Sequence, residues 1–252
     1  KDLRWELTWM GSTVKNKVLK LTSESPEIIS GIYSIKEGNP INTFYMAKSA
    51  GVDPSTGAQL YWVYDKDEDE NITNERISSD YAHASRSKYY LGDRIPDLYG
   101  SLGTNLYWKG IELSVLTTYS IGGLIYDGLY AGSMNNMYYN NNWNTHALRR
   151  WQKPGDVTDV PRILVGGANT TTDRFLIDAS YFAIKNITLG YTLPRSVVNK
   201  AKLNGVRVFG SVDNLALFSH LPGMDPQYNF SGGTTWSYTP NKTFSLGVEI
   251  NF

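Results

Sequence analysis

The sequence predicts an all-β fold, and three observations lead to this prediction. Apolar and polar residues alternate with a period of two through several segments, as they do along a strand with one apolar face. The composition, with 18 Tyr, 7 Trp and 23 Gly, favours strands and tight turns over helices. No apolar run approaches the roughly 18 residues that a transmembrane helix needs. We therefore expect antiparallel strands joined by turns and loops.

The first and last predicted strands show the alternation most clearly. Positions 3, 5, 7 and 9 are Leu or Trp, whereas positions 4, 6 and 8 are polar. At the other end, residues 244, 246, 248, 250 and 252 are apolar, and the residues that alternate with them are polar or Gly. A final strand of this kind that ends in an aromatic residue matches the recognition signal of the outer-membrane barrel assembly machinery. Phe252 is therefore the candidate for that signal.

Strands are also expected between these two ends. Their approximate ranges are 41–49, 97–109, 111–120, 181–193 and 205–217. Lys109 and Gly110 form a two-residue hairpin turn, because Gly tolerates a positive φ. The alternation changes phase near Lys185 and Asn186, which predicts a β-bulge. The count is about seven strands.

The predicted connections fall into two length classes. The short ones are 109–110, 14–30 and 194–204, and the long ones are 50–96, 121–178 and 219–241. Short turns at one rim and long loops at the other are typical of outer-membrane β-barrels. Since an odd number of strands does not close a barrel of the usual even type, and since the sequence opens within a strand, we interpret residues 1–252 as the C-terminal portion of a larger barrel.

Several functional classes have no support in the sequence. The 24 Lys and Arg balance the 24 Asp and Glu, so the basic excess that nucleic-acid binding needs is absent. The chain has no Cys, which excludes disulfides and cysteine nucleophiles. The three His show no metal-ligand spacing, and no Gly-x-Ser-x-Gly nucleophile elbow occurs. We therefore expect a protein that is not an enzyme.

A series of motifs extends over essentially the whole chain. They are VKNKVLKL at 14–21, KEGNP at 36–40, GVDPSTG at 51–57, LGDRIP at 91–96, WQKPGD at 151–156, YFAIKNITLGYTLP at 181–194, VRVF at 206–209, DNL at 213–215 and GMDP at 223–226. In this order and spacing, the chain resembles the C-terminal barrel region of SusC/RagA-like TonB-dependent transporters of Bacteroidota.

The resemblance implies a fold, a location and partners. The fold would be a transmembrane barrel of about 22 strands, with a plug domain and earlier strands outside this chain, long extracellular loops and short periplasmic turns. The location would be the outer membrane of a Gram-negative bacterium. Members of the family import oligosaccharides or peptides together with a SusD-like surface lipoprotein, and the TonB complex supplies the energy through the N-terminal part. Membrane lipid and the barrel assembly machinery would be further partners.

Two groups of residues are candidates for substrate contact. Aromatic side chains in the long loops suit sugar rings or peptides, although they also suit packing of a loop against its neighbours or a lid protein; they are Tyr138, Tyr139, Trp143, Trp151 and Trp236. Polar residues on the strands are expected to face the lumen of the barrel; they are Arg4, Glu6, Asn105, Glu112 and Glu249. Strand aromatics such as Trp5 and Trp108 are expected in the girdles at the membrane interfaces.

An acidic segment is the one weak candidate for a metal site. Asp65, Asp67 and Asp69 have the spacing of a calcium loop, but Glu70 occupies the position that needs Gly, and Arg76 replaces the final bidentate Glu. We expect a solvated acidic loop and no cofactor, with calcium as the weaker alternative. For the whole chain, the alternative to a transporter is a soluble secreted all-β domain that binds carbohydrate, whose apolar strand faces would pack on one another.

Overall fold

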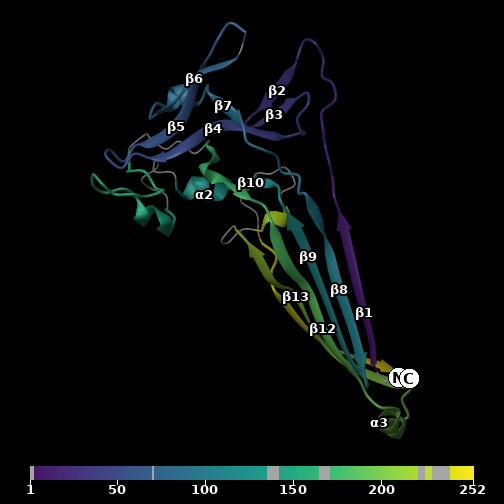
Figure 1. Cartoon of the computed structure of the whole chain (residues 1–252). Helices are drawn as coiled ribbons and strands as arrows, with labels where there is room; N and C mark the ends of the chain where they lie inside the picture. Colours follow the sequence, from purple (N-terminus) through teal and green to yellow (C-terminus); the bar gives the residue numbers. More distant parts are fainter. Residues whose placement is uncertain (1–2, 70, 135–141, 165–170, 221–224, 229–238) are drawn as a thin grey trace.

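The computed structural model describes residues 3–69, 71–134, 142–164, 171–220, 225–228 and 239–252. It consists mainly of antiparallel strands in two parts, a long sheet and a smaller strand-rich unit at one end of it (Figure 1). We call these parts the long sheet and the loop unit. Within the described ranges, no helix has the length and apolar character needed to cross a membrane.

The long sheet contains six strands, each antiparallel to its neighbours. Their order in space is also their order in sequence: β1 (Leu3–Ser12), β8 (Leu98–Trp108), β9 (Ile111–Ile121), β12 (Tyr181–Thr192), β13 (Gly205–Ser219) and β14 (Thr243–Asn251). Six of the strands expected from the alternation are thus confirmed. The residues that the structure describes form an open sheet, with β1 and β14 at its two edges (Figure 1).

The long sheet contains six strands, one fewer than the approximate count of seven that the sequence predicted. The segment predicted as a strand at 41–49 does form β4 (Thr43–Val52), but β4 belongs to a different sheet. Its side chains Phe44, Met46 and Ala47 are buried in the loop unit. Because Met46 and Ala47 are consecutive and point to opposite faces, both faces of β4 are covered. The segment 14–30, predicted as a short turn, is the beginning of the long excursion from β1 to β8 at the far end of the sheet.

The end of the long sheet where both chain ends lie has short connections, as predicted (Figure 1). Lys109 and Gly110 have φ values of 49° and 87°. Two consecutive positive φ angles are the signature of a type I′ hairpin turn. The connection between β12 and β13 carries two short helices, α3 (Arg195–Val198) and η3 (Asn199–Ala201). The predicted β-bulge is also confirmed, because the pairing of β12 shifts register between Ile184 and Asn186 on both of its sides.

The loop unit is more regular than the predicted long loops. Its larger sheet contains β2 (Glu27–Ser30), β3 (Tyr33–Lys36), β4, β5 (Gln59–Lys66) and β6 (Ile72–Ser78), and β7 (Lys88–Tyr90) pairs with β4. The remaining elements are α1 (Tyr81–Ala84), β10 (Leu124–Tyr126), α2 (Gly128–Ser133), η1 (Thr145–Arg149), η2 (Asp173–Phe175), β11 (Leu176–Asp178) and η4 (Pro226–Tyr228). β10 pairs with β11.

The described hydrophobic core lies in the loop unit rather than in the long sheet. Tyr61 and Val63 of β5 pack with Ala47 and Ala84, and all four are almost inaccessible to solvent. In the strands of the long sheet, Ala183 is the one buried hydrophobic residue among those described. The loop unit therefore buries apolar side chains in a core, whereas the described strands of the long sheet leave most of theirs accessible to solvent.

Candidate functional site

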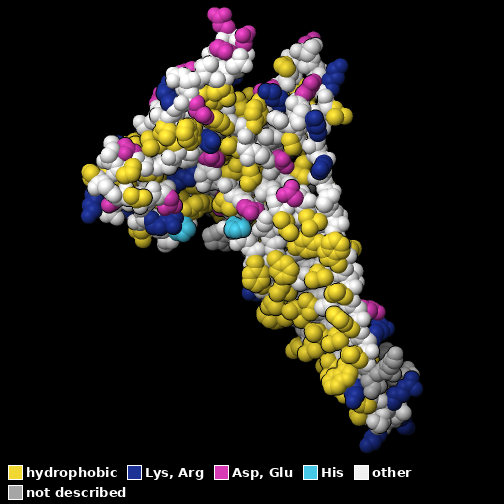
Figure 2. All heavy atoms as spheres, viewed as in Figure 1, with side chains coloured by type: hydrophobic (Ala, Val, Ile, Leu, Met, Phe, Trp, Pro, Cys, Tyr) yellow, Lys and Arg dark blue, Asp and Glu magenta, His cyan; other side chains and the backbone are white. Residues whose placement is uncertain are grey.

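The register of the long sheet separates its side chains into two faces. On one face, a row across the six strands consists of Trp5, Leu106, Leu113, Leu189, Gly210 and Leu246. The exposed fraction is 66% for Trp5 and 92% for Leu246. Figure 2 shows a continuous band of hydrophobic side chains along the strands. This apolar face has no covering layer among the residues that the structure describes.

The opposite face of the long sheet is polar. One row on it consists of Glu6, Asn105, Ser114, Thr188, Ser211 and Ser245, so each of the six strands contributes a polar side chain. The five residues expected to face a lumen all lie on this face, because Arg4 and Glu112 belong to the next row and Glu249 to the row after it. The structure thus brings the predicted polar residues together on one surface.

Arg207 links two of these residues and was not predicted from the sequence. Its Nη2 atom lies 3.0 Å from Oε2 of Glu112, and its Nη1 atom lies 3.8 Å from Oε2 of Glu249. To reach Glu112 on β9, the guanidinium passes over Gly190 of β12, where an added Cβ would lie 3.3 Å from Nε and Nη2. A glycine in an otherwise alternating strand was the sequence signal for this close approach.

The predicted aromatic residues are not all in one place. Tyr138, Tyr139 and Trp236 lie outside the described residues. The ring of Trp151 covers Gly57, where an added Cβ would lie 2.4 Å from it, and its Nε1 donates a 2.9 Å hydrogen bond to the Pro54 carbonyl. This geometry favours the packing alternative for Trp151.

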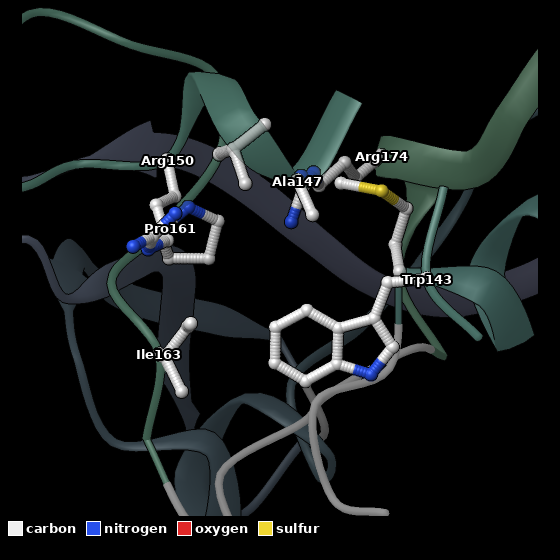
Figure 3. A pocket seen from close by; sticks show the side chains of 8 residues that line it. Trp143, Ala147, Arg150, Pro161, Ile163 and Arg174 are labelled. Carbon is white, nitrogen blue, oxygen red and sulfur yellow. The ribbon is translucent and has the colours of Figure 1, made fainter. Parts of the chain in front are cut away.

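Trp143 lines a pocket in the loop unit (Figure 3). The space between atoms there measures about 290 Å³, including the part open to solvent. Six of the eight lining residues have apolar or aromatic side chains, namely Met134, Trp143, Ala147, Val160, Pro161 and Ile163, and the other two are Arg150 and Arg174. In Figure 3, the side chains of Trp143, Pro161 and Arg174 lie around a common space.

Neighbouring residues hold the backbone of Arg174 in place. Thr172 forms a parallel bridge with Ala47 of β4, and Asp173 Oδ1 accepts a 2.6 Å hydrogen bond from the Ser49 backbone N–H. Phe175 is buried, and Tyr130 packs edge-on against its ring with centroids 5.6 Å apart. Burial lowers the pKa of Arg174 and raises the pKa of Asp173. The sequence showed no pattern that would identify Arg174.

The acidic segment does not gather its three Asp residues around one point. Asp65 Oδ2 accepts hydrogen bonds from Arg76 Nη1 at 2.8 Å and Asn74 Nδ2 at 2.9 Å, and these bonds lower its pKa. Asp67 Oδ1 accepts from the backbone N–H groups of Asn71 and Asp69. In the part of the chain that the structure describes, no group of three His or acidic residues has the arrangement of a metal site.

Phe252 follows the last residue of β14 and is 88% exposed. Its backbone carbonyl accepts a 2.6 Å hydrogen bond from Asn204 Nδ2, which ties the end of β14 to the connection between β12 and β13. Its role as an assembly signal stays a prediction.

Comparison with known proteins adds independent information. No family model matches the sequence. The chain is 25% identical over its whole length to TonB-dependent receptor P3 of Formosa agariphila and to TonB-dependent receptor SusC of Bacteroides thetaiotaomicron. It spans 27% and 25% of the lengths of these two proteins.

Solved structures show the same relationship. The whole chain superposes on 28% of a chain in the structure of the RagAB peptide transporter, with a TM-score of 0.86 and 25% sequence identity. Receptors and transporters, rather than enzymes, are thus the proteins that the chain resembles. Sequence similarity over the full chain and the shared β-sheet architecture agree, and both make the chain similar to SusC/RagA-like TonB-dependent receptors.

Proposed function

We propose that the chain is the C-terminal barrel portion of an outer-membrane transporter that imports nutrients. The observation that carries this proposal is the division of the long sheet into one exposed apolar face and one polar face across all six strands. In water, each Å² of apolar surface left exposed forgoes about 25 cal/mol of stabilisation. In a bilayer, the acyl chains would cover that face, and the polar face would line the aqueous interior of the barrel.

The soluble alternative has less support. A soluble sandwich or barrel buries its apolar strand faces against one another or inside the barrel. In the described residues of the long sheet, the side chains that would form such a core are instead exposed, among them Leu246, Phe244 and Trp5. The side chains on the opposite face of the long sheet are mainly polar, so that face does not form a hydrophobic core either.

The edges of the long sheet support the same proposal. β1 and β14 each have one neighbour in the sheet. Unpaired backbone groups in the hydrocarbon region cost several kcal/mol each, so strands span membranes only in closed barrels. We infer that further strands of the receptor pair with β1 and β14 and close a barrel of about 22 strands. The plug domain and the TonB-contacting segment would belong to the rest of the same receptor.

The loop unit provides the surface for a partner and a substrate. It lies at the end of the long sheet opposite the chain ends (Figure 1), and we assign this end to the cell exterior. A SusD-like surface lipoprotein would cover it there, and TonB would drive uptake from the other side. One of the structural relatives is described as a peptide transporter and one of the sequence relatives is SusC. Oligosaccharides and peptides are therefore the two substrate classes to test.

The experiment is uptake by cells that express the whole receptor with its partner lipoprotein. Labelled oligosaccharides and labelled peptides are supplied to cells with the receptor, without it, and with TonB inactivated. We expect accumulation of one class that needs both the receptor and TonB. Equal accumulation in cells with and without the receptor would contradict the proposal. So would a chain of residues 1–252 that forms a cooperatively melting monomer in water without detergent, which is the result expected for the soluble alternative.

A further inference from the structure

The pocket in the loop unit is lined by an arginine, Arg174, that has one buried guanidinium nitrogen without a hydrogen-bond acceptor. Nη2 of Arg174 is buried, and no acceptor lies within hydrogen-bond distance among the described residues. The guanidinium of Arg174 makes a cation–π contact with the ring of Phe175, whose centroid lies 5.1 Å from Cζ. Buried donors are paired in the great majority of cases, so an unpaired guanidinium nitrogen beside a pocket needs an explanation.

Nearby acidic groups do not neutralise this guanidinium. Asp173, the adjacent residue, directs Oδ1 to the Ser49 backbone N–H at 2.6 Å. Asp159 pairs instead with Arg149 at 3.0 Å, where both side chains are more than half exposed. None of the ion pairs between described residues includes Arg150 or Arg174. Arg174 and Arg150 therefore have no ion-pair partner among the described residues, and the Asp159 carboxylate attracts Arg174 only from beyond ion-pair distance.

The fold holds Arg174 in this unfavourable position instead of releasing it to solvent. The bridge from Thr172 to Ala47, the hydrogen bond from Ser49 to Asp173 and the burial of Phe175 fix the residues on both sides. A donor that is fixed before its acceptor arrives loses little entropy when the acceptor binds. This arrangement is that of a preformed anion site.

We infer that the pocket binds a carboxylate group of the transported substrate, with Arg174 and Arg150 as its partners and with Trp143 packed against the body of the same residue or sugar ring. The inference rests on the proposed function, because it names the chemistry that the receptor selects. A guanidinium binds a planar carboxylate through parallel N–H donors.

The walls of the pocket favour a carboxylate over larger anions. Sulfate and phosphate present more acceptor oxygens than a carboxylate, and the rest of the wall is formed by Met134, Ala147, Val160, Pro161 and Ile163, whose side chains have no N–H or O–H donors.

A carboxylate can come from a peptide or from a sugar acid, and the test distinguishes them. Binding to the purified whole receptor with its lipoprotein is measured by calorimetry for four probes. These are a tripeptide with a free C-terminus, the same tripeptide as its C-terminal amide, a uronic-acid disaccharide and the neutral disaccharide of the same linkage. We expect one of the two carboxylate probes to bind at least 10-fold more tightly than its uncharged counterpart.

Variants connect this preference to the pocket. Arg174→Gln should weaken binding of the preferred carboxylate probe about 10- to 100-fold, as expected for loss of a charge-assisted hydrogen bond, and leave the uncharged probe unaffected. Arg149→Gln is the matched control, because Arg149 is a neighbouring arginine that pairs with Asp159 and does not line the pocket. Its binding should equal that of the unchanged receptor.

Two results would overturn the inference. One is equal binding, or no binding, of each carboxylate probe and its uncharged counterpart. The other is a carboxylate preference that survives in Arg174→Gln. Either result can occur while cells still accumulate oligosaccharides or peptides through the receptor, so failure of this inference is separate from failure of the proposed function. Circular dichroism of the Arg174→Gln receptor checks that a loss of binding is not a loss of fold.

Discussion

At the scale of single residues, Gly57 shows how a backbone requirement and a packing requirement coincide. Its φ is 71°, in the region that L side chains rarely adopt, and an added Cβ would lie 2.4 Å from the ring of Trp151. Gly38 has a similar φ of 89° with no atom near its missing Cβ. The two glycines therefore separate the effect of the dihedral angle from the effect of the contact.

Gly57→Ala should destabilise the loop unit by about 2–4 kcal/mol, because backbone strain of about 1–2 kcal/mol adds to displacement of Trp151. Gly38→Ala should show the backbone strain alone. Hydrogen exchange of residues 51–57 and 151–156 measures the difference. Equal effects of the two substitutions would mean that the contact with Trp151 contributes nothing.

Asp53 organises the turn that precedes Gly57. Its carboxylate accepts from the Thr56 hydroxyl at 2.6 Å and from the Ser55 hydroxyl and N–H at 2.7 and 2.8 Å. These hydrogen bonds lower the pKa of Asp53 to about 2. Since the folded pKa is below the usual value of 3.8, the stabilisation is complete at pH values above about 4 and disappears as the pH falls toward 2.

We therefore expect the protection of the Gly57 amide, which donates to the Asp53 carbonyl at 2.7 Å, to be constant from about pH 7 to 5 and to fall below pH 4. Hydrogen exchange, corrected for the intrinsic rate at each pH, measures this dependence. Asp53→Asn removes the titrating group and should flatten the profile. A profile that falls equally in the variant would assign the change to another group.

At the scale of elements, β14 distinguishes a membrane strand from a soluble one. Leu246 and Ser245 are neighbours on this strand and lie on the apolar and polar faces. Leu246→Lys should destabilise the receptor in lipid vesicles by about 2–4 kcal/mol, since a charge near the bilayer midplane has this cost in barrels, and Ser245→Lys should have a small effect. Urea unfolding in vesicles measures both variants. A tolerated Leu246→Lys would contradict the placement of this face in lipid.

The polar face of the same sheet has its own test. Arg207 is the centre of the contacts to Glu112 and Glu249, and all three side chains are partly exposed, so solvent screening keeps each contact weak. A double-mutant cycle with Arg207→Ala and Glu112→Ala should give a coupling energy of about 0.5–1 kcal/mol in vesicle unfolding. Glu249→Ala, whose closest approach is 3.8 Å, should couple less strongly with Arg207→Ala. Zero coupling in both cycles would show that the contacts do not stabilise the sheet.

At the scale of the whole molecule, the proposed function predicts which end faces the medium. Residues 1–252 contain no Cys, so a cysteine introduced here is the one thiol of this portion, and the unchanged receptor is the labelling control. Glu24→Cys lies in the loop unit, and Lys200→Cys lies in η3 at the opposite end; both positions are exposed. A membrane-impermeant maleimide added to intact cells should label the first and not the second. The reverse pattern would invert the proposed orientation.

Sequence reasoning described the long sheet well because the information there is local. The hairpin at Lys109 and Gly110 and the bulge beside Lys185 follow from neighbouring residues alone. The strand at 41–49 was also recognised, but its sheet was not, since a run of residues shows that a strand forms and does not show which strand it pairs with. The regular structure of the long loops was underestimated, because β5 and β6 form a hairpin within the predicted loop 50–96, and the short strand β10 pairs with the distant β11.

By itself, the sequence determined the all-β class, the two faces of the long sheet and the resemblance to SusC/RagA-like receptors, since alternation and motif order can be read along the chain. The tertiary structure alone decided that β4 leaves the long sheet, that Arg207 reaches Glu112 over Gly190, and that Nη2 of Arg174 is buried without an acceptor at the pocket that Trp143 lines. Each of these depends on contacts between residues far apart in sequence. Burial and pairing are properties of the folded arrangement, and no local pattern encodes them.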